Sequence, residues 1–255
     1  MTKKDFSIIV QVRTGSKRLP GKVLMKYKNK SLIEIMLLRL LKSFNKEKII
    51  LTTTNLREDD ILIKISKKLN IKTFRGSTNN VLERYIKTAS KYRVNNIVRL
   101  TGDCPLIDPI LIKKMLNIYF QKKFDYFSNC YPYNKRSFPV GSDIEIFNLK
   151  ILKFIEKSKP SIYEKEHVTT KILKFYDQFN CEILELKKNN SKMRYTIDYY
   201  KDYEVIIKIL DYLRKKKIYG SFKQIINFLN KNPKLNLYNR QYSKAYYKTK
   251  MKKYI

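Results

Sequence analysis

A basic loop that contains two glycines is the first part of the chain suited to chemistry. It reads RTGSKRLPGK over residues 13–22 and follows an apolar run. Its four cationic side chains, its serine hydroxyl and its backbone N–H groups could surround a polyanion such as a triphosphate. Gly15 and Gly21 would permit close approach of the backbone. The loop matches neither the P-loop nor the dinucleotide-binding GxGxxG pattern, and the alternative is an ordinary basic surface loop.

Acidic residues are scarce, 22 among 255, so those that follow apolar runs stand out. Asp103 follows the run at residues 96–100, and Asp198 follows a strand-like run at residues 194–197. A carboxylate beside bound phosphate is typical of a Mg²⁺ site, which needs about two converging carboxylates. Asp103 and Asp198 are the best candidates, although Asp103 alone could equally be a turn or cap residue. Asp143 and Glu145 alternate on one face of another predicted strand.

His167 is the single histidine of the chain, which excludes a histidine-rich metal centre. A hydrolase triad would depend on this residue, but the Gly-x-Ser-x-Gly elbow is missing and no cysteine stands in a suitable context. His167 is therefore interpreted either as a packing or helix-start residue or as a contact to a sugar.

The order of apolar runs and helical patterns predicts an α/β fold. The Ser31-x-x-Glu34 sequence is a capping-box pattern, and Asp108-Pro109 is typical of a helix start. Alternating strands and helices with short connections predict a mostly parallel sheet covered on both faces, with ligands beyond the carboxyl ends of the strands. Strands are expected at residues 6–12, 48–53, 72–74 and 96–100, and helices at residues 31–44, 58–70, 80–92 and from 108 onward.

The second half of the sequence is less regular. It predicts strands at residues 143–147 and 181–186 and an amphipathic helix at residues 201–217. Because no Gly/Ser-rich linker or internal repeat interrupts the chain, we expect a single catalytic domain over residues 1–232 and a basic tail over residues 233–255.

The charge of the chain is extreme, with 56 Lys and Arg residues and a net charge of +34. One interpretation is a nucleic-acid-binding protein, but only 12 of these cations are arginine, which nucleic-acid sites favour, so that partner is disfavoured. No apolar run is long enough to span a membrane, no signal-peptide pattern is present, and three scattered cysteines do not form a disulfide framework. These features predict a soluble cytoplasmic protein.

Several stretches of the chain are distinctive: IIVQVRTGSKRLPGKVL, TTTNLREDD, FRGSTNNVLERY, VRLTGDCPLIDP, FPVGSDIEIF, KEHVT, RYTIDYYKD and the end from INFLNKNPKL to LYNR. They resemble the cytidylyltransferase family that makes CMP-activated sugars, most closely the branch named after spore coat polysaccharide biosynthesis protein F. The resemblance runs over nearly the whole chain.

The resemblance implies a three-layer α/β/α nucleotide-diphospho-sugar transferase fold. It also implies transfer of CMP from CTP to a sugar hydroxyl, with Mg²⁺ and release of pyrophosphate. Arg13 and Lys22 would then be catalytic together with Asp103 and Asp198, the two carboxylates that would bind the metal. The residues expected to contact the nucleotide are Arg13, Gly15, Ser16, Arg18 and Lys22 at the phosphates, Arg75 and Ser77 near the ribose and base, and Thr101.

The sugar side of the site is less defined. Asp143, Glu145 and His167 are the expected sugar contacts, and a carboxylate of the Asp143/Glu145 pair could accept the hydroxyl proton. Lys135 and Arg136, in a loop over residues 128–141, could pair with the carboxylate of an acidic sugar used for surface glycans, or they could simply be solvated. Related enzymes are commonly homodimers, which predicts the same here.

Two departures from the family pattern indicate that the turn behind the second aspartate differs. Tyr199-Tyr200 replaces the Thr-Pro that usually follows the second aspartate of the family, and Lys201 replaces a glutamate. Another nucleotidyl- or glycosyltransferase of this fold, or a basic RNA-binding protein, is the alternative. Glycosyltransferases of this architecture usually carry an Asp-x-Asp motif, which neither TGDCP nor SDIEIF supplies.

Overall fold

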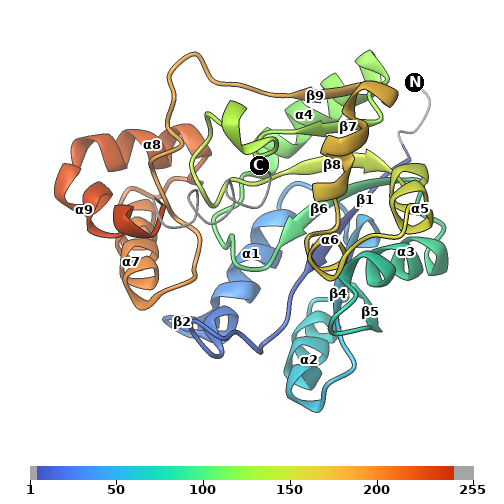
Figure 1. The fold of residues 1–255 in the computed structure, drawn as a ribbon. Helices are drawn as coiled ribbons and strands as arrows, with labels where there is room; N and C mark the ends of the chain where they lie inside the picture. Colours follow the sequence, from blue (N-terminus) through green and yellow to red (C-terminus); the bar gives the residue numbers. More distant parts are fainter. Residues whose placement is uncertain (1–4, 244–255) are drawn as a thin grey trace.

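The computed structural model describes residues 5–243, which form a seven-stranded sheet with helices packed on both of its faces (Figure 1). The strands of this sheet are β1 (Ser7–Gln11), β4 (Ile49–Thr54), β5 (Lys72–Gly76), β6 (Asn96–Thr101), β7 (Tyr126–Ser128), β8 (Glu145–Asn148) and β9 (Cys181–Ile183). Their order is β5-β4-β1-β6-β8-β7-β9, and β8 alone runs antiparallel to both of its neighbours. The predicted three-layer α/β/α fold with a mostly parallel sheet is confirmed.

The central strand β1 shows why the sheet is covered on both sides. Ile8 and Val10 pack against α1 (Leu32–Leu41), α2 (Asp60–Lys68) and α4 (Pro109–Lys122), whereas Ile9 packs against α3 (Val81–Lys91) and α5 (Leu149–Lys157). A strand that is buried on both faces must be apolar at successive positions. The continuous run at the start of the sequence follows from this placement.

Helix starts follow the sequence signals. Ser31 caps α1 through the predicted capping box with Glu34, and Asp108 caps α4 by accepting the backbone N–H of Ile110 at 2.9 Å. These caps satisfy N–H groups that have no partner within the helix. The remaining short elements are the β2 (Lys26–Tyr27) and β3 (Lys30–Ser31) pair, α6 (Ile162–His167), and the 3-10 helices at Lys22–Leu24, Lys46–Lys48, Arg57–Asp59, Tyr133–Lys135 and Thr170–Gln178.

The strands predicted at residues 143–147 and 181–186 have other bounds in the structure, and the strand-like run at residues 194–197 is not a strand. β8 begins at Glu145, and the Asp143 carboxylate two residues earlier accepts a hydrogen bond from the Arg136 guanidinium. β9 ends at Ile183. Among residues 194–197, only Arg194 forms a β-bridge, which pairs it with Val140 outside the named strands. At the end of this segment, the backbone N–H of Asp198 donates to the Asp202 carboxylate at 2.9 Å.

The C-terminal helices form a subsidiary layer beside the sheet (Figure 1). α7 (Tyr200–Lys215) and α8 (Phe222–Lys231) share an apolar core, and α9 (Pro233–Tyr238) packs on both of them. The predicted boundary after residue 232 therefore falls between α8 and α9. The chain after α9 is also buried at Asn239 and Ser243. The rest of the expected tail, residues 244–255, lies outside the described part of the chain.

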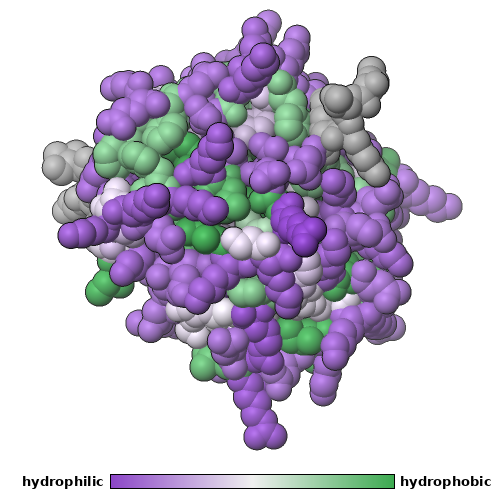
Figure 2. Space-filling view, turned by 90° about the vertical axis from the view of Figure 1, so that its right-hand side faces the viewer, coloured by the Kyte–Doolittle hydropathy of each residue, from purple (hydrophilic) through white to green (hydrophobic). Residues whose placement is uncertain are grey.

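Figure 2 shows hydrophilic side chains over most of one face, with apolar side chains in small separate areas. Among the helices of residues 5–243, none combines the length and the apolar character needed to cross a membrane.

Candidate active site

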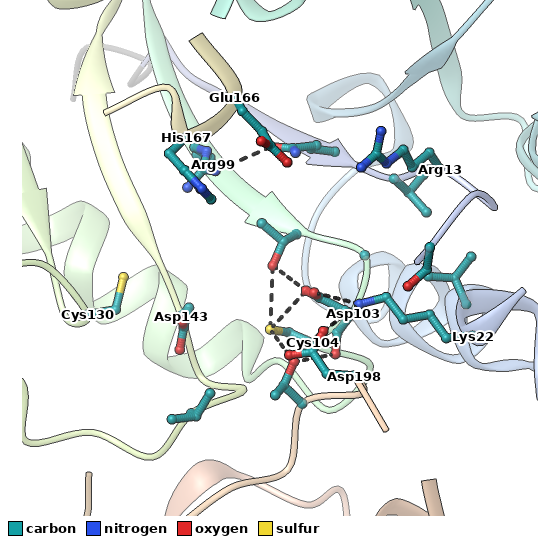
Figure 3. A pocket seen from close by; sticks show the side chains of 18 of the residues that line it. Arg13, Lys22, Arg99, Asp103, Cys104, Cys130, Asp143, Glu166, His167 and Asp198 are labelled. Atoms are coloured by element: carbon teal, nitrogen blue, oxygen red, sulfur yellow. Dashed lines mark hydrogen bonds and ion pairs between the residues drawn. The ribbon is translucent and has the colours of Figure 1, made fainter. Parts of the chain in front are cut away.

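A pocket of about 650 Å³ lies at the carboxyl ends of β1 and β6, where ligands bind in parallel α/β sheets. Figure 3 shows side chains from several distant parts of the sequence around it, with Lys22 and Asp103 close together and His167 farther along the wall. The predicted site residues that line the pocket are Arg13, Gly15, Ser16, Arg18, Lys22, Thr101, Asp103, Asp143, Glu145, His167 and Asp198.

The basic loop is fixed to the sheet by a carboxylate that the sequence analysis did not select. Asp59, fully buried at the start of α2, accepts the backbone N–H and the hydroxyl of Thr14, each at 2.7 Å. Its other oxygen accepts the hydroxyl of Thr53 at 3.0 Å and the hydroxyl of Thr54. Burial raises the pKa of Asp59, but the hydrogen bonds from Thr54 and Thr14 outweigh it, and the pKa lies below its usual value.

Removal of the Asp59 carboxylate is expected to destabilise the fold. Asp59→Ala would leave several buried donors without an acceptor, each at a cost of about 1–3 kcal/mol, so we expect a loss of at least about 2 kcal/mol in the free energy of unfolding by urea titration. The neighbouring Asp60, about half exposed and paired with Arg75 at 2.5 Å, is the matched control. Asp60→Ala should cost under about 1 kcal/mol, and equal losses for the two variants would contradict this assignment.

The two candidate metal ligands converge on one cation. The Lys22 ammonium lies 3.1 Å from Oδ2 of Asp103 and 2.8 Å from Oδ1 of Asp198 (Figure 3). Burial lowers the pKa of Lys22, but the two carboxylates raise it by more, and the net direction is upward. The predicted convergence of these two carboxylates at the edge of the sheet is therefore present in the structure.

The convergence results from docking of the 194–198 segment onto the chain after β6. The carbonyl of Asp103 accepts the backbone N–H of Ile197 and the hydroxyl of Thr196, both at 2.9 Å. The Thr101 hydroxyl donates to Oδ1 of Asp103 at 2.6 Å. Thr101, expected at the nucleotide base, thus uses its hydroxyl to orient the Asp103 carboxylate.

Asp198 is surrounded by three cations. Besides Lys22, Arg18 approaches its Oδ1 at 2.5 Å and Arg194 approaches its Oδ2 at 2.8 Å. Burial raises the pKa of Asp198, but Lys22 and Arg194 lower it by more, so this carboxyl group remains ionised far below neutral pH. The excess of cations leaves the pocket ready to accept further negative charge.

The residues that could hold Mg²⁺ fit a metal that binds together with phosphate. Within residues 5–243 no cluster of three or more His, Cys, Asp or Glu residues could hold a metal by itself. Mg²⁺ commonly uses one or two carboxylates together with substrate phosphates and waters. The carboxylate oxygens of Asp103 and Asp198, which both contact the Lys22 ammonium, supply the two carboxylates of such a site.

The sugar-side carboxylates are both engaged in ion pairs. Glu145 pairs with Arg99 and accepts the hydroxyls of Tyr126, at 2.7 Å, and of Thr169. Asp143 pairs with the Arg136 guanidinium. Neither is an unpaired base, so the geometry does not favour the idea that one of them accepts the hydroxyl proton.

The positions of Lys135, Arg136 and His167 can be compared with the predicted contacts to the sugar. Arg136 is 2% exposed and donates to the carbonyls of Phe138 and Pro139 at 3.0 and 2.7 Å, so it is used within the loop rather than offered to a sugar carboxylate. Lys135 is not among the lining residues. His167 does line the pocket, at the end of α6, with its ring 4.2 Å from that of Tyr163.

Arg75 and Ser77 do not reach the pocket. The Arg75 guanidinium is held by Asp60 and by the carbonyls of Thr54 and Leu56, and the Ser77 hydroxyl accepts the backbone N–H of Asn80 at the start of α3. These contacts direct both side chains away from the pocket.

Arg84, from the same sequence stretch as Arg75, does line the pocket. It lies on α3, is 1% exposed and donates to the Ser77 carbonyl at 2.7 Å, while its buried Nε has no hydrogen-bond partner. Burial lowers its pKa, and the nearby Arg13 lowers it further. The sequence signal that could have identified Arg84 is its position as a cationic residue on the otherwise apolar inner face of a predicted helix.

Comparisons with known proteins show the family of the chain. The model of the cytidylyltransferase family matches residues 7–247. The chain belongs to the cytidylyltransferase family. It is therefore a nucleotidyltransferase that uses CTP.

Individual relatives resemble this cytidylyltransferase over most of their length. The spore coat polysaccharide biosynthesis protein SpsF of Bacillus subtilis is 33% identical over 90% of this chain and 95% of its own. A cytidylyltransferase structure from Leptospira borgpetersenii superposes with a TM-score of 0.84 at 34% identity, covering 92% of this chain and 97% of its own. The structure of CMP:2-keto-3-deoxy-manno-octonic acid synthetase with CTP has the same fold, with a TM-score of 0.60 at 15% identity, covering 82% and 99%.

Proposed function

We propose that this cytidylyltransferase transfers the cytidylyl group of CTP to a hydroxyl of an acidic sugar for surface glycan synthesis, with Mg²⁺, and releases pyrophosphate. The observation that carries the proposal is the meeting of the basic loop with the Asp103–Asp198 pair in one pocket. The acidic sugar is supported by the cationic character of the pocket, and by the keto-acid sugar that the name of the synthetase of the same fold specifies.

The reaction requires positioning and charge neutralisation more than covalent catalysis. The sugar hydroxyl oxygen forms a bond to the α-phosphorus, the bond from the α-phosphorus to the bridging oxygen breaks, and pyrophosphate leaves. The hydroxyl proton passes to solvent or to the departing oxyanion. Arg13, Arg18 and Lys22 stand where the loop would hold the phosphates and stabilise the charge that develops on the leaving group.

Asp103 and Asp198 would hold the metal, which supplies neutralisation of phosphate charge when bound. The chain's own part is to keep these carboxylates ionised and in place. Thr101 orients Asp103, and Arg194 holds Oδ2 of Asp198. Burial raises the pKa of the Cys104 thiol well above its usual value, so the thiol beside Asp103 stays protonated and is unsuited to act as a nucleophile.

CTP with Mg²⁺ should raise the melting temperature of the protein by more than ATP or GTP at equal concentration. At 100 times the dissociation constant, ligand binding adds about 2.7 kcal/mol to the free energy of unfolding. Differential scanning fluorimetry with the four nucleotides measures this directly. Equal shifts with all four would indicate generic polyanion binding by a strongly basic protein and would favour the RNA-binding alternative.

A further inference from the structure

The segment that follows α9, residues 239–243, lies against the pocket. Tyr242 lines the pocket, and both Asn239 and Ser243 are buried. The sequence analysis assigned this segment to a basic tail, and no role is attached to it by the family resemblance. Its contacts converge on the surroundings of Asp198.

The first contact is a hydrogen-bonded bridge from Asn239. This side chain, 1% exposed, donates from Nδ2 to Oδ1 of Asp202 at 2.7 Å and to the carbonyl of Arg194 at 3.2 Å. Asp202 is fully buried and accepts two bonds from the Arg194 guanidinium, each at 2.9 Å. It also accepts the backbone N–H of Asp198 at 2.9 Å. Asn239 therefore holds the group that fixes both the backbone of Asp198 and its arginine partner.

The second contact is an aromatic stack. The ring of Tyr242 lies 3.9 Å from that of Tyr199 at an interplanar angle of 15°. The Arg18 guanidinium stands over the Tyr199 ring at 5.5 Å while it pairs with Asp198. Because an arginine over an aromatic face loses conformational freedom, the stack restricts where the Arg18 charge can lie. Tyr199 is the first of the two residues, Tyr199-Tyr200, that replace the usual Thr-Pro after this aspartate.

We propose that Asn239 and Tyr242 are positioning residues of the active site, which hold Asp198 and Arg18 in the arrangement that receives metal and phosphate. The proposal rests on the proposed function for the identity of those ligands. Asn239 acts through Asp202 and Arg194, and Tyr242 acts through Tyr199. Partners of this kind behind a metal ligand commonly change metal affinity by about 10- to 100-fold.

The test compares full-length variants by Mn²⁺ titration in the presence of CTP, followed by electron paramagnetic resonance, and by the Mg²⁺ concentration that gives half-maximal turnover. Asn239→Ala and Tyr242→Ala should each weaken Mn²⁺ binding about tenfold and raise the Mg²⁺ requirement to a similar extent. Tyr242→Phe keeps the ring and should stay within about twofold of the wild type, because the stack rather than the hydroxyl makes the contact.

Tyr238→Ala is the matched control. Tyr238 is exposed on α9, donates its hydroxyl to Glu204 at 2.9 Å and does not line the pocket, so its removal should leave Mn²⁺ affinity unchanged. The inference is overturned if Asn239→Ala and Tyr242→Ala lower the melting temperature but keep wild-type Mn²⁺ affinity, or if Tyr238→Ala weakens it equally. The Mn²⁺ readout needs no sugar, so a wild type that binds Mn²⁺ and CTP but transfers to no sugar would refute only the proposed function.

Discussion

Lys22→Ala is expected to lower kcat/KM by about 10- to 150-fold while the protein stays folded. Lys22 faces both Asp103 and Asp198, and in the proposed reaction it contacts phosphate. Loss of a charge-assisted contact in a sheltered site costs about 1.5–3 kcal/mol, which gives this range. Asp198 would keep Arg18 and Arg194 as partners, so the fold should persist. Pyrophosphate-release kinetics and circular dichroism measure the two effects.

Arg13→Ala should behave like Lys22→Ala, and Lys17→Ala is the control within the same loop. Lys17 is exposed, and although it lines the rim of the pocket it forms no ion pair among the described residues. Its removal should change kcat/KM by less than about threefold. If the three variants lost activity equally, the loop would act as diffuse positive charge and not as a shaped phosphate site.

The second large effect is expected at the two carboxylates. Asp103→Asn and Asp198→Asn should each raise the Mg²⁺ requirement and lower turnover by about a hundredfold, the scale found when one group that stabilises transition-state charge is lost. The double variant should lose little more than either single variant, because groups that act as a unit are not additive. Turnover as a function of Mg²⁺ concentration checks this. Additive losses would show that the two carboxylates act independently.

The two single variants should differ in stability. Asp198 is nearly fully buried among three cations, whereas the Asp103 side chain is 29% exposed and contacts one. Removal of one partner from a buried ion pair is costly, so Asp198→Asn should lower the melting temperature more than Asp103→Asn. A similar melting temperature for the two variants would contradict the inference that the buried Asp198 carboxylate contributes more to stability than the Asp103 carboxylate does.

The fold and the centre of the site could be predicted because both depend on local patterns. Strands such as β1 and β6 are buried on both faces and therefore read as apolar runs, and the residues that follow them must lie at one edge of the sheet. Asp103 was placed by this rule alone. Asp198 was correctly predicted to lie beside Asp103, but the reason given was partly wrong. The segment before Asp198 is not a strand and instead hydrogen-bonds to the backbone of Asp103.

The roles of other residues could not be predicted from the sequence, because each role depends on which groups the side chain contacts in the folded protein. Arg75 and Arg84 belong to one sequence motif. Only the folded structure shows that Arg75 pairs with Asp60, whereas Arg84 lines the pocket. Arg136 similarly pairs inside its own loop. Asn239 contacts residues 37 and 45 positions earlier in the chain, a pairing that no local pattern indicates.

The most direct test of the central claim is a pyrophosphate-release assay with CTP, UTP, ATP and GTP against a panel of acidic and neutral sugars, with and without EDTA. Mass spectrometry of the products would accompany it. We predict release with CTP and an acidic sugar, formation of the corresponding CMP-sugar, and loss of both with EDTA. Release with another nucleotide in preference to CTP, transfer only to neutral sugars, or activity that resists EDTA would contradict this account.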